Sequence, residues 1–480
     1  MENDNNKLIL GLEIENDKFN FLSSIEKAKI KGNNELEEIE KSIFDNEENI
    51  KKLTSECDKV DYILATCSGV ICEIIDIFLV AEPGQSQLQN ITDTWFKNRT
   101  KDFAKVCGWN EEGNTIESAI RFLEHKFKIP YDQTGAGGIG AWIYELNPKN
   151  HHFKSLAHNP SLFGLFFSIL NQFNNSSSFI SNGELITLEK ADDNFKLKGN
   201  DVPSKVFCGF INWFGHIVSD MSGSSGSSTR GMGIPSPLWT WTNDVITIKK
   251  SLKIPVTVFD KNINELSLKI YKEGYDARFQ TAQSIPVIIN ELIVRFFYST
   301  RRMIRYFKDN DLKKFNFSEL WKNCEPFSNA TVKRMLTIAH GTFCLIDTSD
   351  AIVNGFIYGG GYFNVSEFIM RLNIPGIGRF SISLYGELDR AIKRNAKLEE
   401  VKYLKMKECV VNDYLTSLNE LAEMYDDTDL KNMIEDFKTS DLYIEAFEKS
   451  MLLAEKRNVD KNKILKNKAN IDSYFTGGNL

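Results

Sequence analysis

The central part of the chain contains apolar runs that are too long to be ordinary β-strands. The clearest runs extend from Ser161 to Phe173 and from Val287 to Tyr306. Strands usually have about 4–8 residues, whereas runs of about 10 or more indicate helices. Strand signals are sparse, and the best one is the segment that begins at Ile254 with Ile-Pro-Val-Thr-Val-Phe. The sequence therefore predicts a mainly α protein with a large multi-helical core and few strands.

Composition divides the 480-residue chain into three regions. Residues 1–58 are rich in Glu, Lys and Asn and have apolar residues at helical spacing, which predicts an acidic helical N-terminal arm. Residues 59–385 hold nearly all of the Gly, Trp, Pro and His, and they form the predicted apolar core. Residues 386–480 return to charged helical sequence and form a predicted C-terminal helical region. The two helical arms could dock a protein partner.

The overall composition also restricts the function and the location. A net charge of −7 argues against a general nucleic-acid binder. The eight cysteines show no Cys-x-x-Cys pattern, so we interpret them as reduced residues of an intracellular protein. The start of the sequence is acidic and shows no secretory signal, which predicts a cytoplasmic location. The Asn/Lys/Ile-rich composition is typical of low-GC bacteria and their mobile elements.

Histidine is rare in this chain and unevenly distributed. Of the six histidines, His151, His152 and His158 lie in one short stretch. A fourth, His216, precedes Asp220 by one helical turn, which puts both side chains on the same face of a helix. Histidine nitrogen and aspartate oxygen are common ligands of hydrolytic metals, so the pattern predicts a site for a divalent ion, Zn or Mn. The predicted ligands are His152, His158, His216 and Asp220.

These residues also have structural interpretations. His216 and Asp220 could form a hydrogen bond within the helix without any metal. His158 lies just before a predicted helix start, where Asn159 or Ser161 would be the cap, and it could simply belong to that turn. The segment from His340 to Asp347 is interpreted as structural, with side chains that cap or pair.

Two Gly-rich segments lie close to the histidines in the sequence. Residues 134–140 contain Gly-x-Gly-x-x-Gly, but no clear strand precedes it and no acidic residue follows at the right distance to hold a ribose. We therefore interpret this segment as a flexible connection. The Ser/Gly-rich segment 222–233 directly follows Asp220 and contains Arg230. Its hydroxyls, backbone amides and guanidinium could hold a phosphate beside a metal, and the alternative is a linker.

The segment from Tyr62 to Ala81 is almost apolar enough to span a bilayer, which takes about 20 residues. Glu73 and Asp76 interrupt it near its centre, and a central carboxylate costs about 2.5–3.5 kcal/mol on insertion scales. We favour a buried core helix, in which both carboxylates would pair with a buried Arg, His or hydroxyl. In the alternative, a helix in contact with lipid, the carboxylates would face inward.

A basic and aromatic stretch follows in the second half of the core. Its cations share one helical stripe beside Phe and Tyr, and they are Arg295, Arg301, Arg305 and Lys308. Such a helix would suit an anionic lipid surface and predicts attachment at the periphery of the inner membrane. The alternative is the exposed basic end of a core helix.

The order of these motifs resembles the membrane-associated metal-dependent hydrolases. An apolar helix with Asp76 comes first, then His152 and His158 before a second apolar helix, and then His216-x-x-x-Asp220. In that family a Pro-Asp-x-Asp element precedes a His-Arg-Gly-x-Thr-His-Ser motif, and a His-x-x-x-Asp helix follows. This chain lacks the proline and the second aspartate, has Phe-Lys in place of Arg-Gly, and has one more residue between its two histidines. The resemblance implies a metal-dependent hydrolase.

Two functions from different classes follow. The first is a metal-dependent hydrolase of the phosphoester type, in which the ion would activate water and polarise the substrate. Asp76 or Glu73 would then act as general base, and Arg230 would stabilise the phosphate. The second is a non-enzymatic structural or interaction protein of a membrane-proximal or mobile-element-encoded assembly, in which the buried polar groups would be structural links.

Overall fold

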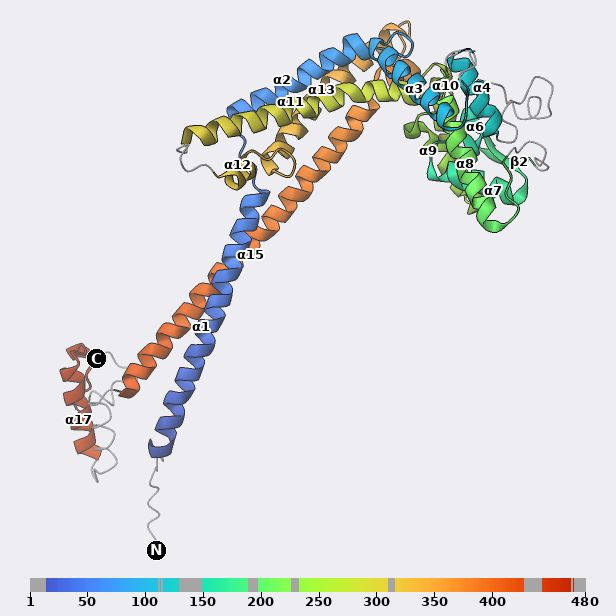
Figure 1. Cartoon of the computed structure of the whole chain (residues 1–480). Helices are drawn as coiled ribbons and strands as arrows, with labels where there is room; N and C mark the ends of the chain where they lie inside the picture. The colour runs from blue at the N-terminus through green and yellow to red at the C-terminus, as the bar shows by residue number, and fades with distance from the viewer. Residues whose placement is uncertain are drawn as a thin grey trace. The chain divides into compact units, whose positions relative to one another are not determined.

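The computed structural model describes residues 14–110, 113, 115–128, 149–188, 197–225, 233–309, 316–426, 443–467 and 469. Within these residues the protein is built of helices, and the only strands are β1 and β2 (Figure 1). The prediction of a mainly α protein with few strands is confirmed. The chain divides into two compact units, and each is described here by itself.

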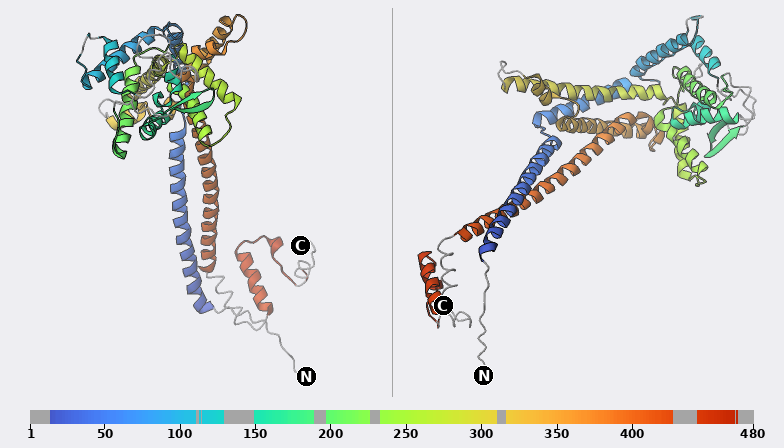
Figure 2. Two further views of the ribbon diagram at one scale, coloured as in Figure 1. Left: turned by 90° about the vertical axis from the view of Figure 1, so that its right-hand side faces the viewer. Right: turned by 60° about the horizontal axis from the view of Figure 1, so that its bottom comes forward.

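The first unit, called here the terminal unit, contains Met1–Thr54 and Ala391–Leu480. Its helices are α1 (Ile14–Leu53), most of α15 (Ile374–Asp426), α17 (Tyr443–Lys456) and the short η6 (Lys461–Lys463). Within this unit α1 and α15 run side by side (Figure 2). Their apolar seam is formed by Ile39, Ile43, Val401 and Val411. The N-terminal and C-terminal helical segments therefore pack against each other.

The second unit, called here the central unit, contains Ser55–Arg390. Its bounds are 54/55 and 390/391, whereas composition predicts three regions with bounds at 58/59 and 385/386. The elements in the first half of this unit are α2 (Lys59–Ile75), the π-helical turn η1 (Asp76–Val80), α3 (Gln87–Val106), α4 (Ile116–Lys126), α6 (His151–Lys154), η3 (Leu156–His158), α7 (Leu162–Asn174), β1 (Ser177–Ser181) and β2 (Glu184–Leu188). Those in the second half are α8 (Val202–Asp220), α9 (Pro237–Ser251), α10 (Val258–Lys272), α11 (Ala277–Asp309), α12 (Phe317–Cys324), α13 (Ala330–Ile357) and α14 (Val365–Arg371).

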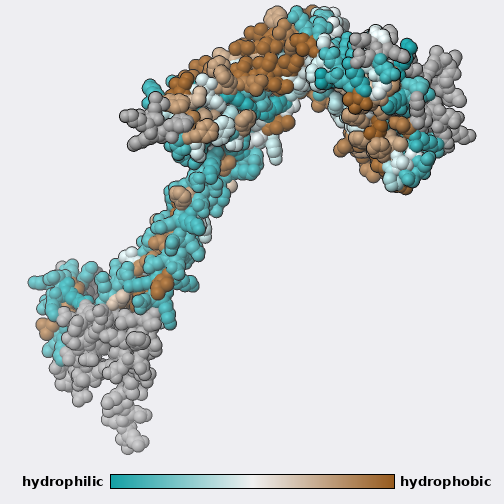
Figure 3. Space-filling view, in the orientation of Figure 1, coloured by the Kyte–Doolittle hydropathy of each residue, from teal (hydrophilic) through white to brown (hydrophobic). Residues whose placement is uncertain are grey.

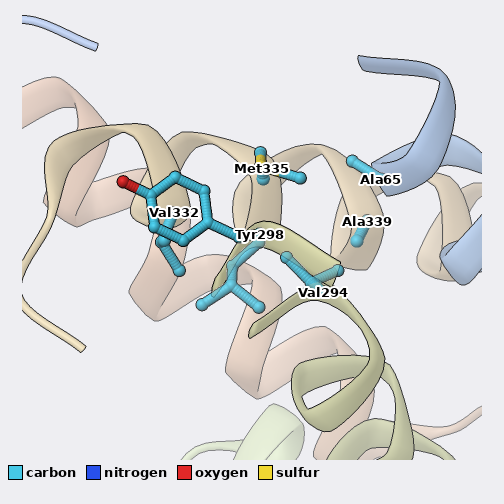
Figure 4. Packing of buried hydrophobic residues seen from close by; sticks show 7 residues of the cluster. Ala65, Val294, Tyr298, Val332, Met335 and Ala339 are labelled. Atoms are coloured by element: carbon cyan, nitrogen blue, oxygen red, sulfur yellow. The ribbon is translucent and has the colours of Figure 1, made fainter. Parts of the chain in front are cut away.

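Three long helices of the central unit, α2, α11 and α13, pack along one another (Figure 1). A cluster of buried apolar side chains lies between them (Figure 4), and it consists of Ala65, Val294, Tyr298, Val332, Met335, Leu336 and Ala339. The backbones of α2 and α13 come close at Gly69, where an added Cβ would lie 2.4 Å from the carbonyl oxygen of Ala339. The two helices therefore hold a fixed register.

Helices α7 and α8 pack closely together in another part of the central unit. The backbones meet at Gly209, where an added Cβ would lie 2.6 Å from Cα of Ile169. Ser168 Oγ donates a hydrogen bond to the carbonyl oxygen of Gly209 at 2.8 Å. Helix α7 begins as predicted, because Ser161 caps it by accepting a hydrogen bond from the backbone N–H of Gly164. This packing fixes the surroundings of the candidate site.

The prediction of a strand that begins at Ile254 is wrong. Helix α10 starts at Val258, because Thr257 and Asp260 form a reciprocal capping box. The strands lie elsewhere, as an antiparallel hairpin of β1 and β2. Asn182 and Gly183 form its turn with φ values of 52° and 75°, and such a dipeptide is the usual signal for a two-residue hairpin turn.

Among the described residues, one helical segment, Lys59–Val80, has the length and composition to cross a membrane. Glu73 and Asp76 both face the protein interior. Asp76 pairs with the buried Arg371, as predicted for a core helix, whereas the prediction of a pairing partner is wrong for Glu73, whose oxygens have none among the described residues. The opposite side carries an apolar stripe whose members are 49–70% exposed, namely Ile63, Ile71, Ile74 and Phe78. Figure 3 shows apolar side chains gathered over α2. The helix is therefore buried on one side and presents an apolar surface on the other.

The basic stripe of α11 is largely engaged within the protein. Arg301 forms ion pairs with Asp58 and Asp61 at the start of α2. Arg295 pairs with Glu291 on its own helix at 2.9 Å. Arg305 is half exposed and lies 3.3 Å from Asp58. The lipid contact of this stripe stays a prediction, but much of its charge is balanced by carboxylates of the same chain.

Candidate metal centre

Three short segments of the central unit carry the candidate site. Helix α6 bears His151 and His152, the 3-10 turn η3 ends with His158, and the last turn of α8 bears His216 and Asp220. None of these five residues is more than 4% exposed. The histidines that the sequence singled out as a group therefore come together in a buried polar cluster.

Helix α8 is positioned at both ends. Asp201 caps its start in a reciprocal capping box with Ser204. Near the other end, the Trp213 indole N–H donates to the carbonyl oxygen of Asn159 at 2.9 Å. That bond ties α8 to the residue that directly follows His158. The C-terminal half of α8 is therefore tied to the residue after η3 by a half-buried side chain.

The imidazole rings stand close to one another and to Asp220. The ring centroid of His158 lies 4.3 Å from that of His216 and 4.9 Å from that of His152. Asp220 Oδ2 lies 3.1 Å from Nδ1 of His152 and 3.0 Å from Nε2 of His216. His152, His216 and Asp220 therefore offer ligand atoms to a common point, and the His158 ring lies beside two of them. The role of these residues as metal ligands stays a prediction.

The geometry of this cluster fits a metal site. The contacts of Asp220 with His152 and His216 are short, and the three residues offer ligand atoms within 4.8 Å of one another. Metal bonds of about 2.0–2.1 Å place neighbouring ligand atoms of a tetrahedral ion about 3.3–3.4 Å apart. The observed separations are close to that value. Three imidazoles and one carboxylate also form a ligand set that suits Zn²⁺ or Mn²⁺.

A hydroxyl group orients one of the candidate ligands. Ser155 Oγ lies 2.6 Å from Nδ1 of His158. Metal-bound histidines commonly use their second ring nitrogen in a hydrogen bond, which fixes the tautomer and the ring plane. Ser155 is itself fully buried, so this contact is shielded from water. Nε2 of His158 would then be the ligand atom.

Asp220 is held in its ionised form. Burial alone would raise the pKa of this carboxyl, but the adjacent rings of His152 and His216, when protonated, outweigh burial and hold the pKa well below its usual range. Both rings would give up that proton on binding an ion. A carboxylate must be deprotonated to bind a metal. The surroundings of Asp220 therefore favour the form that a ligand needs.

His151 is a further member of the cluster that the predicted ligand set did not include. Its ring centroid lies 4.1 Å from that of His152 and 5.5 Å from that of His158. His151, His152 and His158 also form a triplet of candidate ligand atoms within 4.8 Å of one another. The signal was present in the sequence, because the two histidines are adjacent.

Asp76, the predicted general base, lies outside the histidine cluster. Its carboxylate is close to those of Glu73 and Asp347, and it contacts Arg371 and Asn373. The assignment of Asp76 to the histidine site is therefore wrong. Spacing alone cannot show which buried group an acid on an apolar helix will face.

The remaining sequence predictions concern Arg230, the Gly-rich segment 134–140 and His340. Arg230 and the Gly-rich segment 134–140 lie outside the described residues. His340 lies apart from the other histidines, with Nε2 3.7 Å from Glu291 and Nδ1 3.4 Å from the side chain of Asn290. These contacts fit the structural interpretation of His340.

In comparisons with protein-family models, curated proteins and solved structures, no significant match to this chain was found.

Proposed function

We propose that the protein is a metal-dependent hydrolase acting on a phosphoester-type substrate. The observation that carries this proposal is a buried cluster in which His152, His216 and Asp220 offer ligand atoms within 4.8 Å of one another, with the His158 ring beside those of His152 and His216. These residues come from three separate segments of the chain. Buried imidazoles and carboxylates are costly unless they are paired or bind an ion.

The proposed ligands of a Zn²⁺ or Mn²⁺ ion are His152, His158, His216 and Asp220. When bound, such an ion supplies Lewis acidity and lowers the pKa of a coordinated water. The protein contributes the fixed geometry: α8 holds two ligands one turn apart, and Ser155 orients His158. Burial of the cluster keeps bulk water from competing with these contacts.

His151 takes the proton-transfer role in this proposal. With Asp76 elsewhere, the site needs another group that can accept and return a proton. His151 stands beside His152 in the same short helix and is 3% exposed. Histidine is the usual general acid–base at neutral pH because its ordinary pKa is about 6.5.

The phosphoester class is supported by the segment that follows Asp220. Serine, glycine and Arg230 dominate residues 222–233, and such a loop can bind an anion through hydroxyls, amides and a guanidinium. Its described start is fixed, because Ser225 donates its backbone N–H to Asp276 at 3.3 Å. The segment therefore follows the proposed ligand Asp220 directly in the chain.

The proposal also includes a location at a membrane surface. Helix α11 has exposed apolar side chains like those of the stripe on α2. On α11 they are Ile288, Leu292 and Phe296, which are 56–65% exposed. Large exposed apolar patches mark interaction sites for proteins or membranes. The resemblance to membrane-associated hydrolases leads to the same expectation, and it stays a prediction.

The test is phosphoester hydrolysis by the full-length protein after loading with Zn²⁺ or Mn²⁺. Simple probes are the mono- and bis-p-nitrophenyl phosphates. Asp220→Asn should lower kcat/KM at least 100-fold. Asp201→Asn, the matched control at the other end of α8, should leave it within about twofold, because Asn also caps helices well.

Two results would count against the proposal. One is the absence of hydrolysis of either probe by the metal-loaded protein. The other is an equal loss of activity in Asp220→Asn and Asp201→Asn, which would point to folding instead of ligation. Either result would favour the non-enzymatic interaction protein.

A further inference from the structure

A second group of buried carboxylates lies where α2 meets α13. Glu73 lies in the last turn of α2, Asp76 begins the π-helical turn η1, and Asp347 is on α13. One oxygen from each lies within 4.8 Å of the others, and none of the three residues is more than 1% exposed. This group shares no residue with the histidine cluster.

Two of the three carboxylates have hydrogen-bond donors. Asp76 accepts from Nδ2 of Asn373 at 2.5 Å and from Arg371 at 3.4 Å. Both oxygens of Asp347 lie 3.1 Å from the backbone N–H of Asn373. Each of these acids is therefore held in place by the segment after α14.

Glu73 differs from its neighbours. Neither of its carboxylate oxygens has a hydrogen-bond partner among the described residues. The side chain is 1% exposed, and it points toward Asp76 and Asp347. A buried polar group is normally satisfied by a partner, so a group without one requires an explanation.

The charges in this region do not balance. Arg371 is the guanidinium in contact with Asp76, and it is shared with Asp350, whose Oδ2 lies 2.5 Å from Nε. Three buried carboxylates thus face one another, and the guanidinium of Arg371 contacts only one of them. Such a group is stable only if it holds protons or a cation.

We propose that Glu73, Asp76 and Asp347 bind a hard divalent cation of the Mg²⁺, Mn²⁺ or Ca²⁺ class. A set of carboxylate oxygens without nitrogen or sulfur is the ligand type that these ions prefer. The unpartnered Glu73 supplies the oxygens that a cation would engage. The ion would link α2 to α13 and so brace the long helices of the central unit. This proposal does not depend on the function of the histidine site.

The test is Mn²⁺ binding to the full-length protein, followed by electron paramagnetic resonance. The histidine centre is first filled with Zn²⁺, and the same titration is repeated on His216→Ala. Both samples should bind Mn²⁺, and Mg²⁺ or Ca²⁺ should compete with it. Glu73→Gln should weaken this binding at least tenfold. Glu82→Gln, an acid close to Arg371 but outside the group, is the matched control and should bind as wild type does.

Glu73→Gln keeps the shape of a protonated carboxyl, so the variant is expected to fold. Its melting temperature provides the second measurement. If the cation binds, Mg²⁺ raises the melting temperature of the wild type and not that of Glu73→Gln. The proposal is overturned if the wild type and Glu73→Gln bind Mn²⁺ with equal affinity. It is also overturned if no cation shifts the wild type while Glu73→Gln alone melts higher, because the carboxylates would then simply hold protons.

Discussion

His216 Nε2 and Asp220 Oδ2 lie 3.0 Å apart across the last turn of α8. The i, i+4 spacing on one helix fixes their separation before any other part of the site is added. His152 then reaches the same carboxylate oxygen from α6, at 3.1 Å. This pair is the fixed half of the candidate metal centre, and the short segments α6 and η3 supply the rest.

The contact between Ser155 and His158 should control metal affinity. Ser155→Ala removes the hydroxyl that orients the imidazole, and loss of such a partner typically weakens metal binding about 10–100-fold. Competition with a chromogenic chelator measures the change in Kd. Ser178→Ala is the control, because Ser178 contacts Thr187 in the hairpin and not a candidate ligand. Equal affinities in the two variants would contradict a metal-orienting role for Ser155.

The close packing of α7 and α8 should tolerate no side chain at Gly209. Gly209→Ala places a methyl group 2.6 Å from Cα of Ile169, and overpacking of this kind costs about 1–3 kcal/mol. Gly386→Ala is the control, because nothing lies within 4 Å of its Cβ position in α15. That substitution should stabilise its helix by about 0.5–1 kcal/mol. Chemical unfolding measures both effects, and the same sign for both would contradict the packing argument.

Asp244 should make stability depend on pH. Its carboxyl is partly buried beside Ser161, and burial raises its pKa from 3.8 to about 6. The folded state therefore holds the proton more tightly than the unfolded state. The resulting stabilisation is complete below about pH 4 and is lost as the pH rises to about 6. Asp244→Asn should stabilise the protein at pH 7 by about 1–3 kcal/mol and change little at pH 4.

Asp260 provides a control of opposite sign. Lys249 and Thr257 hold the pKa of its carboxyl below the ordinary value, at about 2. Its contribution is therefore present above about pH 4 and is lost as the pH falls toward 2. Asp260→Asn should destabilise the protein at pH 7. Urea unfolding of both variants at pH 4 and pH 7 tests the pair, and destabilisation by Asp244→Asn at pH 7 would contradict the assignment.

Membrane association should resist salt. Arg301 is engaged by Asp58 and Asp61, whereas Ile74 and Phe78 are exposed. Screening weakens ionic contacts and leaves apolar ones intact. Cosedimentation with anionic vesicles should therefore persist at about 1 M salt, where the Debye length is about 3 Å. Ile74→Glu with Phe78→Glu should reduce it at least tenfold, and release by salt alone would instead support the basic stripe of α11.

The helical fold could be predicted because long apolar runs and helix caps are local signals. The wrong prediction of a strand at Ile254 also comes from a local signal. The alternating apolar residues there are typical of a strand, but Thr257 and Asp260 form a capping box that starts a helix instead. The hairpin at Asn182 also has a local signal, the Asn-Gly turn, but its strands of five residues each are too short to stand out as apolar runs.

The candidate site could be predicted only in part. His216 and Asp220 form a local pair, and the scarcity of histidine in the chain indicated His158. The position of Asp76 could not be predicted in this way, because its neighbour Asp347 lies far along the chain and meets it only through the packing of α2 on α13. Which buried acid faces which cluster is decided by tertiary packing.

The most direct measurement of the central claim is the Zn²⁺ content of the full-length protein after reconstitution and gel filtration. We predict one tightly held Zn²⁺ per chain in the wild type. In the double variant His158→Ala, His216→Ala that ion should be lost while the helical circular dichroism is retained. The account would be contradicted if the wild type retained no Zn²⁺, or if the folded double variant retained as much as the wild type.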